Sequence, residues 1–292
     1  MTEAPDRQIP GVYRRRIGDI VVTALSDGYV DVGYGMFGVI AQAEAESILR
    51  NAFRPAPPRL AVNAFLIHSA GRVALVDTGC GPDRGAPLGR VAKHIEAAGV
   101  APEEIDTILL THMHPDHSNG LTATDGMPFY PHVQLVLAEP ELRHWLDDAA
   151  MARASAPHRE RFFLGARSQI KPYLDRVRFA EGEVFPGVTA MPLPGHTPGH
   201  TGYLVSSGGE DLLIWGDIVH HSDIQIRRPD VWVEQDSDPE TAVATRKRTL
   251  EMASRDRLLI AGAHVHFPGF LHVSGDAGTG YELHPELWVQ DL

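Results

Sequence analysis

The chain has 292 residues, and its 26 basic and 38 acidic side chains give a formal net charge of −12. This balance argues against a nucleic-acid partner, because binding to phosphate backbones needs a basic face. The single cysteine, Cys80, excludes an internal disulfide, and no apolar stretch approaches the roughly eighteen residues of a membrane span. The first residues lack the basic head and apolar core of a signal peptide, so we expect a cytoplasmic protein that binds no membrane.

The first third of the chain predicts strands, two short helices and one glycine-spaced loop. Apolar patterns, proline stops and a glycine after the last helix set the boundaries. The predicted elements are a strand over 20–25 with a turn at Asp27-Gly28, a helix over 43–53, strands over 62–68 and 73–77, and a helix over 91–98. The apolar loop 32–38 forms either the lip of a substrate pocket or a buried connection.

The rest of the chain alternates strands and helices without a linker, so we expect one domain over residues 1–292. Strands are predicted over 108–110, 132–137, 177–180, 188–192, 203–206, 212–215 and 258–261, and helices over 139–150, 151–170 and 239–254. From residue 267 on, aromatic and glycine-rich sequence predicts short strands and loops. His144 and His158 have no motif around them, and we expect surface or structural roles for both.

Four potential metal ligands fall within six residues directly after the apolar run 108–110. They are His112, His114, Asp116 and His117. The run predicts a buried strand, so these side chains lie on the loop that leaves its carboxyl end. Imidazole and carboxylate are donors that zinc and similar divalent ions accept. The alternative is a chance histidine cluster on a surface loop.

The spacing H-x-H-x-D-H resembles the signature of the metallo-β-lactamase superfamily, and later segments extend the resemblance. Residues 194–200 are similar to the family's G-H-T-P-G-H segment, in which we take the second histidine, His200, as the ligand and His196 as a group that orients a neighbour. Gly216-Asp217 matches the strand-end aspartate that bridges two metals, and His264 matches the last histidine ligand. Asp77, in the D-T-G of residues 77–79, matches an aspartate that braces the metal loop.

The resemblance implies an α/β fold, a four-layer αββα sandwich, with two divalent transition-metal ions. It assigns His112, His114 and His200 to one ion, Asp116, His117 and His264 to the other, and Asp217 to a bridge between them. Zinc is the first expectation, with cobalt, manganese or iron as alternatives. Two such ions lower the pKa of a shared water toward about 7. Asp116 can also pass a proton to the leaving oxygen.

Residues 216–220, the helix that begins at Asp238-Pro239 and the segment 262–269 resemble the methyl parathion hydrolase branch of lactonases and aryl-esterases. The resemblance covers about residues 21–273. Within the single domain we therefore distinguish residues 1–60 (strand, lip loop and helix), the metal-binding core 61–273 and the tail 274–292. The branch implies a homodimeric, dinuclear metal-dependent hydrolase of small uncharged lactones and esters, with phosphotriesters as a further class. We expect penicillins and cephalosporins to be poor substrates.

Many related lactonases carry a tyrosine three residues after the bridging aspartate, where this chain has His220. We expect the His220 imidazole to donate a hydrogen bond to the substrate's carbonyl oxygen; the alternative is that it only packs. A β-lactamase with a cysteine ligand is excluded, since Asp217 occupies that position. Two other functions remain as alternatives, a thioester hydrolase of the glyoxalase II type and a non-catalytic, metal-bearing ligand sensor.

Overall fold

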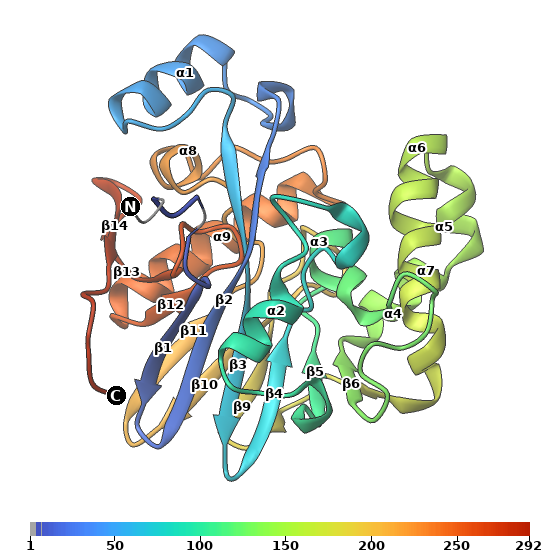
Figure 1. Ribbon diagram of the computed structural model, residues 1–292. Coiled ribbons are helices and arrows are strands. Elements are labelled where there is room, and N and C mark those ends of the chain that lie inside the picture. Colours follow the sequence, from blue (N-terminus) through green and yellow to red (C-terminus); the bar gives the residue numbers. More distant parts are fainter. Residues whose placement is uncertain (1–3, 7) are drawn as a thin grey trace.

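Two seven-stranded sheets form the centre of the computed structural model, which describes residues 4–6 and 8–292 (Figure 1). In the first sheet the strands follow the order β1 to β7, and in the second the order β14 to β8. The first sheet contains β1 (Val12–Ile17), β2 (Ile20–Asp31), β3 (Arg59–Ser69), β4 (Arg72–Val76), β5 (Thr107–Leu109), β6 (Gln134–Leu137) and β7 (Val177–Phe179). The second contains β8 (Glu183–Phe185), β9 (Val188–Pro192), β10 (Thr201–Ser207), β11 (Glu210–Ile214), β12 (Leu259–Ala261), β13 (Phe270–Asp276) and β14 (Gly280–Pro285). Each half of the chain therefore builds one sheet.

The main core lies between the two sheets, and β3 shows how a strand divides its side chains. Phe65 and Ile67 belong to the core between the sheets, whereas Ala64 and Leu66 belong to a second cluster on the outer face of the first sheet. Because β3 is covered on both faces, its sequence is a nearly continuous apolar run instead of an alternation. That run is the feature that predicts the strand.

Helices cover the outer face of each sheet. On the first sheet, α2 (Val91–Ala97), α4 (Glu139–Leu146) and α7 (Gly165–Ile170) contribute Ile95, Trp145 and Ile170 to the outer cluster. On the second sheet, α9 (Pro239–Arg255) packs through Leu250 and Ala253. These layers confirm the predicted αββα sandwich.

A smaller cluster lies beyond the end of the sheets, where α1 (Gln42–Asn51) packs near α8 (Ser222–Arg227) (Figure 1). The 3-10 turn η1 (Tyr34–Met36) belongs to the glycine-spaced loop, and Phe37 at its end is buried with Leu49 and Ile224. The helix predicted over 43–53 is thus confirmed to within two residues at each end.

The turn predicted at Asp27-Gly28 is wrong, because β2 continues through these residues to Asp31. The pairing with β3 shifts between Ser26 and Gly28, so the expected turn is a β-bulge. Asp27 is buried there, and its carboxylate accepts hydrogen bonds from the backbone N–H groups of residues 80, 89, 90 and 91. This tertiary contact, which is not visible from local sequence, keeps the chain extended.

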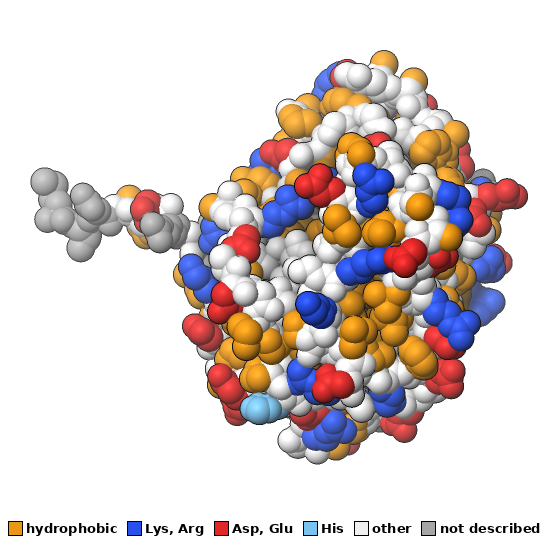
Figure 2. Space-filling model, turned by 90° about the vertical axis from the view of Figure 1, so that its right-hand side faces the viewer, with side chains coloured by type: hydrophobic (Ala, Val, Ile, Leu, Met, Phe, Trp, Pro, Cys, Tyr) orange, Lys and Arg blue, Asp and Glu red, His pale blue; other side chains and the backbone are white. Residues whose placement is uncertain are grey.

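The helical region predicted over 139–170 is broken into short pieces: α4, α5 (Asp148–Arg153), α6 (Ala156–His158), the π-helical turn η5 (Arg159–Leu164) and α7. The first break comes at Asp147, whose side chain accepts a 2.8 Å hydrogen bond from the backbone N–H of Ala149 and so starts a new helix. On the outward face of this region, basic and acidic side chains intermingle with apolar ones (Figure 2). This face offers no continuous basic surface.

The remaining short elements are η2 (Pro82–Arg84), η3 (Pro102–Glu104), α3 (Pro115–Ser118), η4 (Asn119–Leu121) and η6 (Lys171–Arg176). The strands β1 and β8 and the helix α8 were not predicted from the sequence. The tail after residue 267 forms the β13–β14 hairpin and loops, as predicted. Among the described residues no helix is long and apolar enough to cross a membrane.

Four strands end at the same edge of the sandwich and carry the motif residues there. Asp77 follows β4, the histidine-rich loop follows β5, Asp217 follows β11 and His264 follows β12. β4 and β5 are parallel neighbours in one sheet, and β11 and β12 are parallel neighbours in the other. Parallel pairing brings the carboxyl ends of each pair together, and face-to-face packing brings the two pairs together.

Candidate metal centre

The histidine-rich loop leaves β5 extended and then turns abruptly into α3. His114 is the last extended residue, with φ −67° and ψ 155°, and Pro115 is the first residue of α3. Proline suits this position because its fixed φ is helical and it needs no partner for a backbone N–H. The change from extended to helical backbone separates His112 and His114 from Asp116 and His117, which is the division that the sequence predicts.

Asp217 lies at the centre of the cluster, with histidine nitrogens on several sides. Its carboxylate oxygens lie 3.1–3.7 Å from the Nε2 atoms of His112, His117, His196, His220 and His264. Two ligands that each bind one zinc ion at about 2.0–2.1 Å in tetrahedral geometry lie roughly 3.3 Å apart. The observed separations match those of atoms that share a metal ion.

Several of these atoms are buried without a hydrogen bond. Within residues 4–6 and 8–292, His112 Nε2, His114 Nε2, His117 Nε2 and Asp217 Oδ1 have no hydrogen-bond partner. Each such buried group would cost about 1–3 kcal/mol if nothing satisfied it. Divalent cations bound here would satisfy the His112 and His117 nitrogens and the Asp217 oxygen, so the donor set fits metal ions.

The electrostatics divide the histidines of the cluster into two kinds, those whose pKa is lowered and those whose pKa is raised. Burial lowers the pKa of both His112 and His114 well below the usual value, so both rings are neutral and keep a lone pair. Burial alone would raise the pKa of Asp217, but His117 and His264 hold it well below the usual range. Burial alone would also lower the pKa of His117 and His264, but Asp217 raises the pKa of both. The centre therefore combines the neutral imidazoles of His112 and His114 with an ionised carboxylate that attracts positive charge.

The structure brings His196 into the cluster, where the sequence predicts His200. His200 uses both ring nitrogens elsewhere: Nδ1 donates to the backbone oxygen of Leu193 at 2.9 Å, and Nε2 accepts from the backbone N–H of Asp217 at 2.9 Å. His196, predicted only to orient a neighbour, instead places Nε2 at 2.9 Å from His114 Nδ1 and 3.4 Å from Asp217 Oδ2. His196 takes the place of His200 in the cluster, and His200 holds the backbone of Asp217.

The cluster divides into groups that could each hold an ion. One group contains His112, His114 and His196, and another contains Asp116, His117 and His264. Asp217 groups with His112 and His117 and also with His196 and His220, so it lies between the two. The first two groups contain the residues predicted for the two ions, except that His196 stands where His200 is predicted.

Carboxylates and backbone carbonyls orient the far nitrogens of the histidines. Asp77 Oδ2 lies 2.7 Å from His117 Nδ1, and Asp77 also accepts from the backbone N–H and the hydroxyl of Thr111, which is the expected brace. Asp236 Oδ1 lies 2.8 Å from His196 Nδ1, a contact that no sequence motif indicates. These contacts place the second nitrogen of each ring toward the centre.

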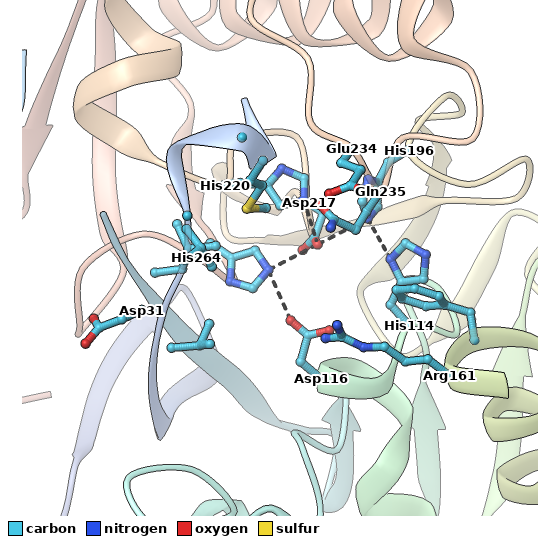
Figure 3. A pocket seen from close by; sticks show the side chains of 17 residues that line it. Asp31, His114, Asp116, Arg161, His196, Asp217, His220, Glu234, Gln235 and His264 are labelled. Carbon is cyan, nitrogen blue, oxygen red and sulfur yellow. Dashed lines mark hydrogen bonds and ion pairs between the residues drawn. The ribbon is translucent and has the colours of Figure 1, made fainter. Parts of the chain in front are cut away.

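A cavity of about 450 Å³ opens on the cluster, and His114, Asp116, His196, Asp217, His220 and His264 line it (Figure 3). The loop 32–36 also contributes Val32 and Met36 to the lining of this cavity, as the pocket-lip interpretation of the loop predicts. Phe162 from η5 adds an aromatic wall, with its ring 4.9 Å from the ring of His114. A helix is predicted over 151–170, but no sequence motif indicates that Arg161 of η5 also lines the cavity.

The remaining histidines differ in whether they line the cavity or pack against aromatic rings. His220 lines the cavity, and burial lowers its pKa to about 4. His221 is buried near Phe37 of the lip, with ring centroids 6.2 Å apart. His144 and His158 lie against the ring of Phe163, outside the groups that could hold a metal, which fits the structural role expected of them.

This chain is similar to known proteins in both its sequence and its fold. The sequence model of the metallo-beta-lactamase superfamily matches residues 57–264. The chain belongs to the metallo-beta-lactamase superfamily. A solved relative, described as hydrolase AbOPH in the beta lactamase superfamily, is 31% identical with a TM-score of 0.91, and the match covers 97% of this chain and 100% of that one.

Two lactonases are also similar. AidC, a dizinc quorum-quenching lactonase in complex with a product, is 24% identical with a TM-score of 0.90 over 96% of this chain and 99% of that one, a likeness of fold. The N-acyl homoserine lactonase of Bacillus thuringiensis is 25% identical over 179 residues, 60% of this chain and 62% of its own length. This chain thus spans less than two thirds of the length of that curated relative.

Proposed function

We propose that this protein is a dinuclear metal-dependent hydrolase of small uncharged lactones and esters. The observation that carries the proposal is the Asp217 cluster, in which two groups of ligand atoms share one carboxylate at the base of a cavity. A structural zinc site is normally a closed cage of four ligands rich in cysteine. This cluster is free of cysteine and lines a cavity wide enough for a small molecule, which supports a catalytic site.

In this proposal His112, His114 and His196 hold one ion, Asp116, His117 and His264 hold the other, and Asp217 bridges them. Zinc suits the nitrogen and oxygen donors, with cobalt, manganese or iron as alternatives. When bound, such a pair supplies Lewis acidity and lowers the pKa of water toward about 7. Asp77 and Asp236 keep His117 and His196 oriented through hydrogen bonds of 2.7 and 2.8 Å.

Two cavity side chains are proposed to act on the substrate itself. Asp116 is the more exposed carboxylate, with 32% of its side chain accessible against 3% for Asp217, and it can carry a proton to the leaving oxygen. His220 lines the cavity, and its Nε2 lies 3.2 Å from Asp217 Oδ2. In this proposal the imidazole N–H donates to the carbonyl oxygen of a bound ester. An N–H aimed at charge that develops in the transition state is typically worth about 10²–10³ in rate.

The charges that line the cavity favour an uncharged substrate. Asp31 is paired with Arg59 at 2.7 Å, and Asp116 and Asp217 belong to the metal cluster. The remaining lining charges, Arg161 and Glu234, are opposite in sign and balance each other. The apolar wall suits an acyl or aryl group, and the lactonases similar in fold or sequence support a lactone as the first class to test.

The test is a panel of substrates against protein loaded with zinc, cobalt or manganese. We expect close to two metal equivalents by elemental analysis and turnover of lactones or aryl esters, with phosphotriesters as a further class in the panel. Asp217→Ala should lose most of the second equivalent together with the activity. A single equivalent with full turnover would overturn the dinuclear site. Preference for a glutathione thioester would favour the glyoxalase II alternative, and two equivalents without turnover of any ester would favour the ligand sensor.

The role of His220 is tested separately with His221→Ala as the matched control. Both side chains are buried imidazoles next to each other, but only His220 is among the residues that line the cavity. His220→Ala should keep both metals and lower kcat on a lactone at least tenfold, and His221→Ala should have a much milder effect. Unchanged kcat of His220→Ala at full metal occupancy would leave His220 as a packing residue.

We also propose a homodimer. The support is the resemblance of residues 216–220 and the segment 262–269 to the methyl parathion hydrolase branch, which implies a homodimer. Light scattering should give twice the mass of the 31.9 kDa chain. A monomer at micromolar concentration would remove this part of the proposal.

A further inference from the structure

Glu141 is a buried carboxylate outside the ligand set, and its contacts connect the two loops that carry His112, His114 and His196. It lies in the first turn of α4, and 0% of it is exposed. Burial raises the pKa of its carboxyl group, and nothing in the proposed chemistry uses it. A carboxylate in such a place must be held by several donors.

The two oxygens of Glu141 face different loops. Oε1 accepts from the backbone N–H of Met113 at 2.9 Å, and Oε2 accepts from the hydroxyl of Thr197 at 2.5 Å and the backbone N–H of Gly199 at 3.1 Å. Met113 lies between the ligands His112 and His114, and Thr197 directly follows the ligand His196. One side chain therefore connects the ligand loop of the first sheet to the ligand loop of the second.

The packing around Glu141 leaves little freedom for the connection. Trp145, one turn along α4, donates its indole N–H to Oε1 at 2.6 Å and fixes the carboxylate. A Cβ atom at Gly199 would lie 2.2 Å from the backbone nitrogen of Glu141, so the second loop lies directly against the start of α4. One backbone hydrogen bond, from Thr201 N to Thr111 O at 2.9 Å, also joins the two loops farther from the ligand atoms.

We propose that Glu141 is a positioning residue that sets His196 against His112 and His114 and thereby tunes the affinity of one of the two metal sites. The inference rests on the proposed dinuclear function. Among the described residues, no hydrogen bond or ion pair joins Glu141 to the other group, Asp116, His117 and His264. Loss of the Glu141 contacts should therefore weaken one metal equivalent and spare the other.

The experiment compares Glu141→Gln with the matched variant Asp27→Asn. A glutamine keeps one acceptor oxygen, but in either orientation its amide N–H groups meet the backbone N–H of Met113 or of Gly199. Asp27 is also a fully buried carboxylate with four backbone donors, at residues 80, 89, 90 and 91, and none of these residues is a proposed ligand. The two variants should lose similar thermal stability.

Affinities for Zn²⁺ are measured by competition with a chromophoric chelator, and the absorption spectrum of the cobalt-loaded protein reports ligand geometry. In Glu141→Gln we expect one equivalent to bind about 10–100-fold more weakly, a changed cobalt spectrum, and the other equivalent within about threefold of wild type. In Asp27→Asn we expect both affinities and the spectrum to be unchanged. Thr197→Val removes one hydroxyl contact and keeps the shape of the side chain. It should weaken the same metal equivalent by a smaller factor, and it provides the test if Glu141→Gln does not fold.

Three results would overturn the proposal. They are unchanged affinities in both Glu141→Gln and Thr197→Val, an equal loss at both equivalents, or an equal loss in Asp27→Asn. These readouts do not depend on turnover. Wild-type protein that binds two equivalents but hydrolyses no ester would remove the proposed function and leave the role of Glu141 standing. If the wild type binds two equivalents and hydrolyses an ester, and Glu141→Gln binds metal with unaltered affinities, the proposed function would stand and the role of Glu141 would be refuted.

Discussion

Replacing Asp236 with asparagine removes one charge from the contact that orients His196 and leaves the ligand itself in place. In the native structure Asp236 Oδ1 faces His196 Nδ1 at 2.8 Å, and Oδ2 accepts from the backbone N–H of Val233 at 2.9 Å. Because His196 Nδ1 donates to the carboxylate, Nε2 carries the lone pair that faces Asp217. An asparagine can satisfy only one of the two donors with its oxygen, and its amide group then meets the other.

The size of the effect follows from those two contacts. If the amide faces His196, the ring loses its acceptor and the tautomer with a lone pair on Nε2 is no longer favoured. If the amide faces Val233, a buried backbone N–H is left without a partner. Loss of a contact that orients a metal-bound histidine typically weakens metal affinity about 10–100-fold, which is about 1.4–2.7 kcal/mol. Because Asp236 contacts only His196 among the proposed ligands, one of the two equivalents should weaken.

The assay is isothermal titration of the metal-free variant with Zn²⁺, which resolves two binding events when their affinities differ. Asp238→Asn is the matched control, because it makes the same charge change two residues away, at the N-cap of α9, where asparagine also caps well. We expect Asp238→Asn to bind both equivalents as the wild type does. Equal weakening of both equivalents in Asp236→Asn, or no weakening at all, would refute the assignment of His196 as a ligand of one site.

Further predictions concern the corrected ligand, acid stability and substrate choice. His196→Ala should reduce bound metal from two equivalents toward one, while His200→Gln, which can still accept from the Asp217 backbone, should retain two; the opposite result in elemental analysis would restore His200 as the ligand. Burial alone would raise the pKa of Asp223, but His266 and then Arg54 lower it to about 2. Since an unfolded aspartate has a pKa near 3.9, this stabilisation of roughly 2 kcal/mol is present above about pH 4 and is lost as the pH falls toward 2. Asp223→Asn should therefore flatten the dependence of the free energy of unfolding on pH in this range, and an unchanged slope would contradict the pairing. In the wild type each methylene added to an acyl chain should raise kcat/KM by at most about fourfold. Phe162→Ala should reduce this gain. An unaltered dependence of kcat/KM on chain length would place the acyl group elsewhere. Nitrocefin should be hydrolysed far more slowly than a lactone, and comparable rates would show that Arg161 holds a substrate carboxylate.

The local sequence predicts the order of the strands around the site and most of the side chains that they carry there. The apolar runs before residues 77, 112, 217 and 264 predict strands that end at polar residues, because a buried strand needs such a run and its exit needs solvent or ligands. The H-x-H-x-D-H spacing separates two pairs of ligands because Pro115 starts a helix, and both features are local. The αββα fold, the division into two groups and the central position of Asp217 were predicted from the resemblance of these motifs to the metallo-β-lactamase superfamily.

Which histidine of the segment 194–200 lies in the cluster is apparent only from the tertiary structure. His196 and His200 are four residues apart in a glycine-rich loop, and sequence spacing does not show that His200 is held by Leu193 and the Asp217 backbone. The bulge at Asp27 and the loop connection through Glu141 have the same origin. Each depends on donors at least 28 residues away in sequence, brought together when the sheets pack. Local sequence specifies which side chains a strand delivers to the edge of its sheet, whereas the hydrogen bonds that orient them there form only between segments that folding makes neighbours.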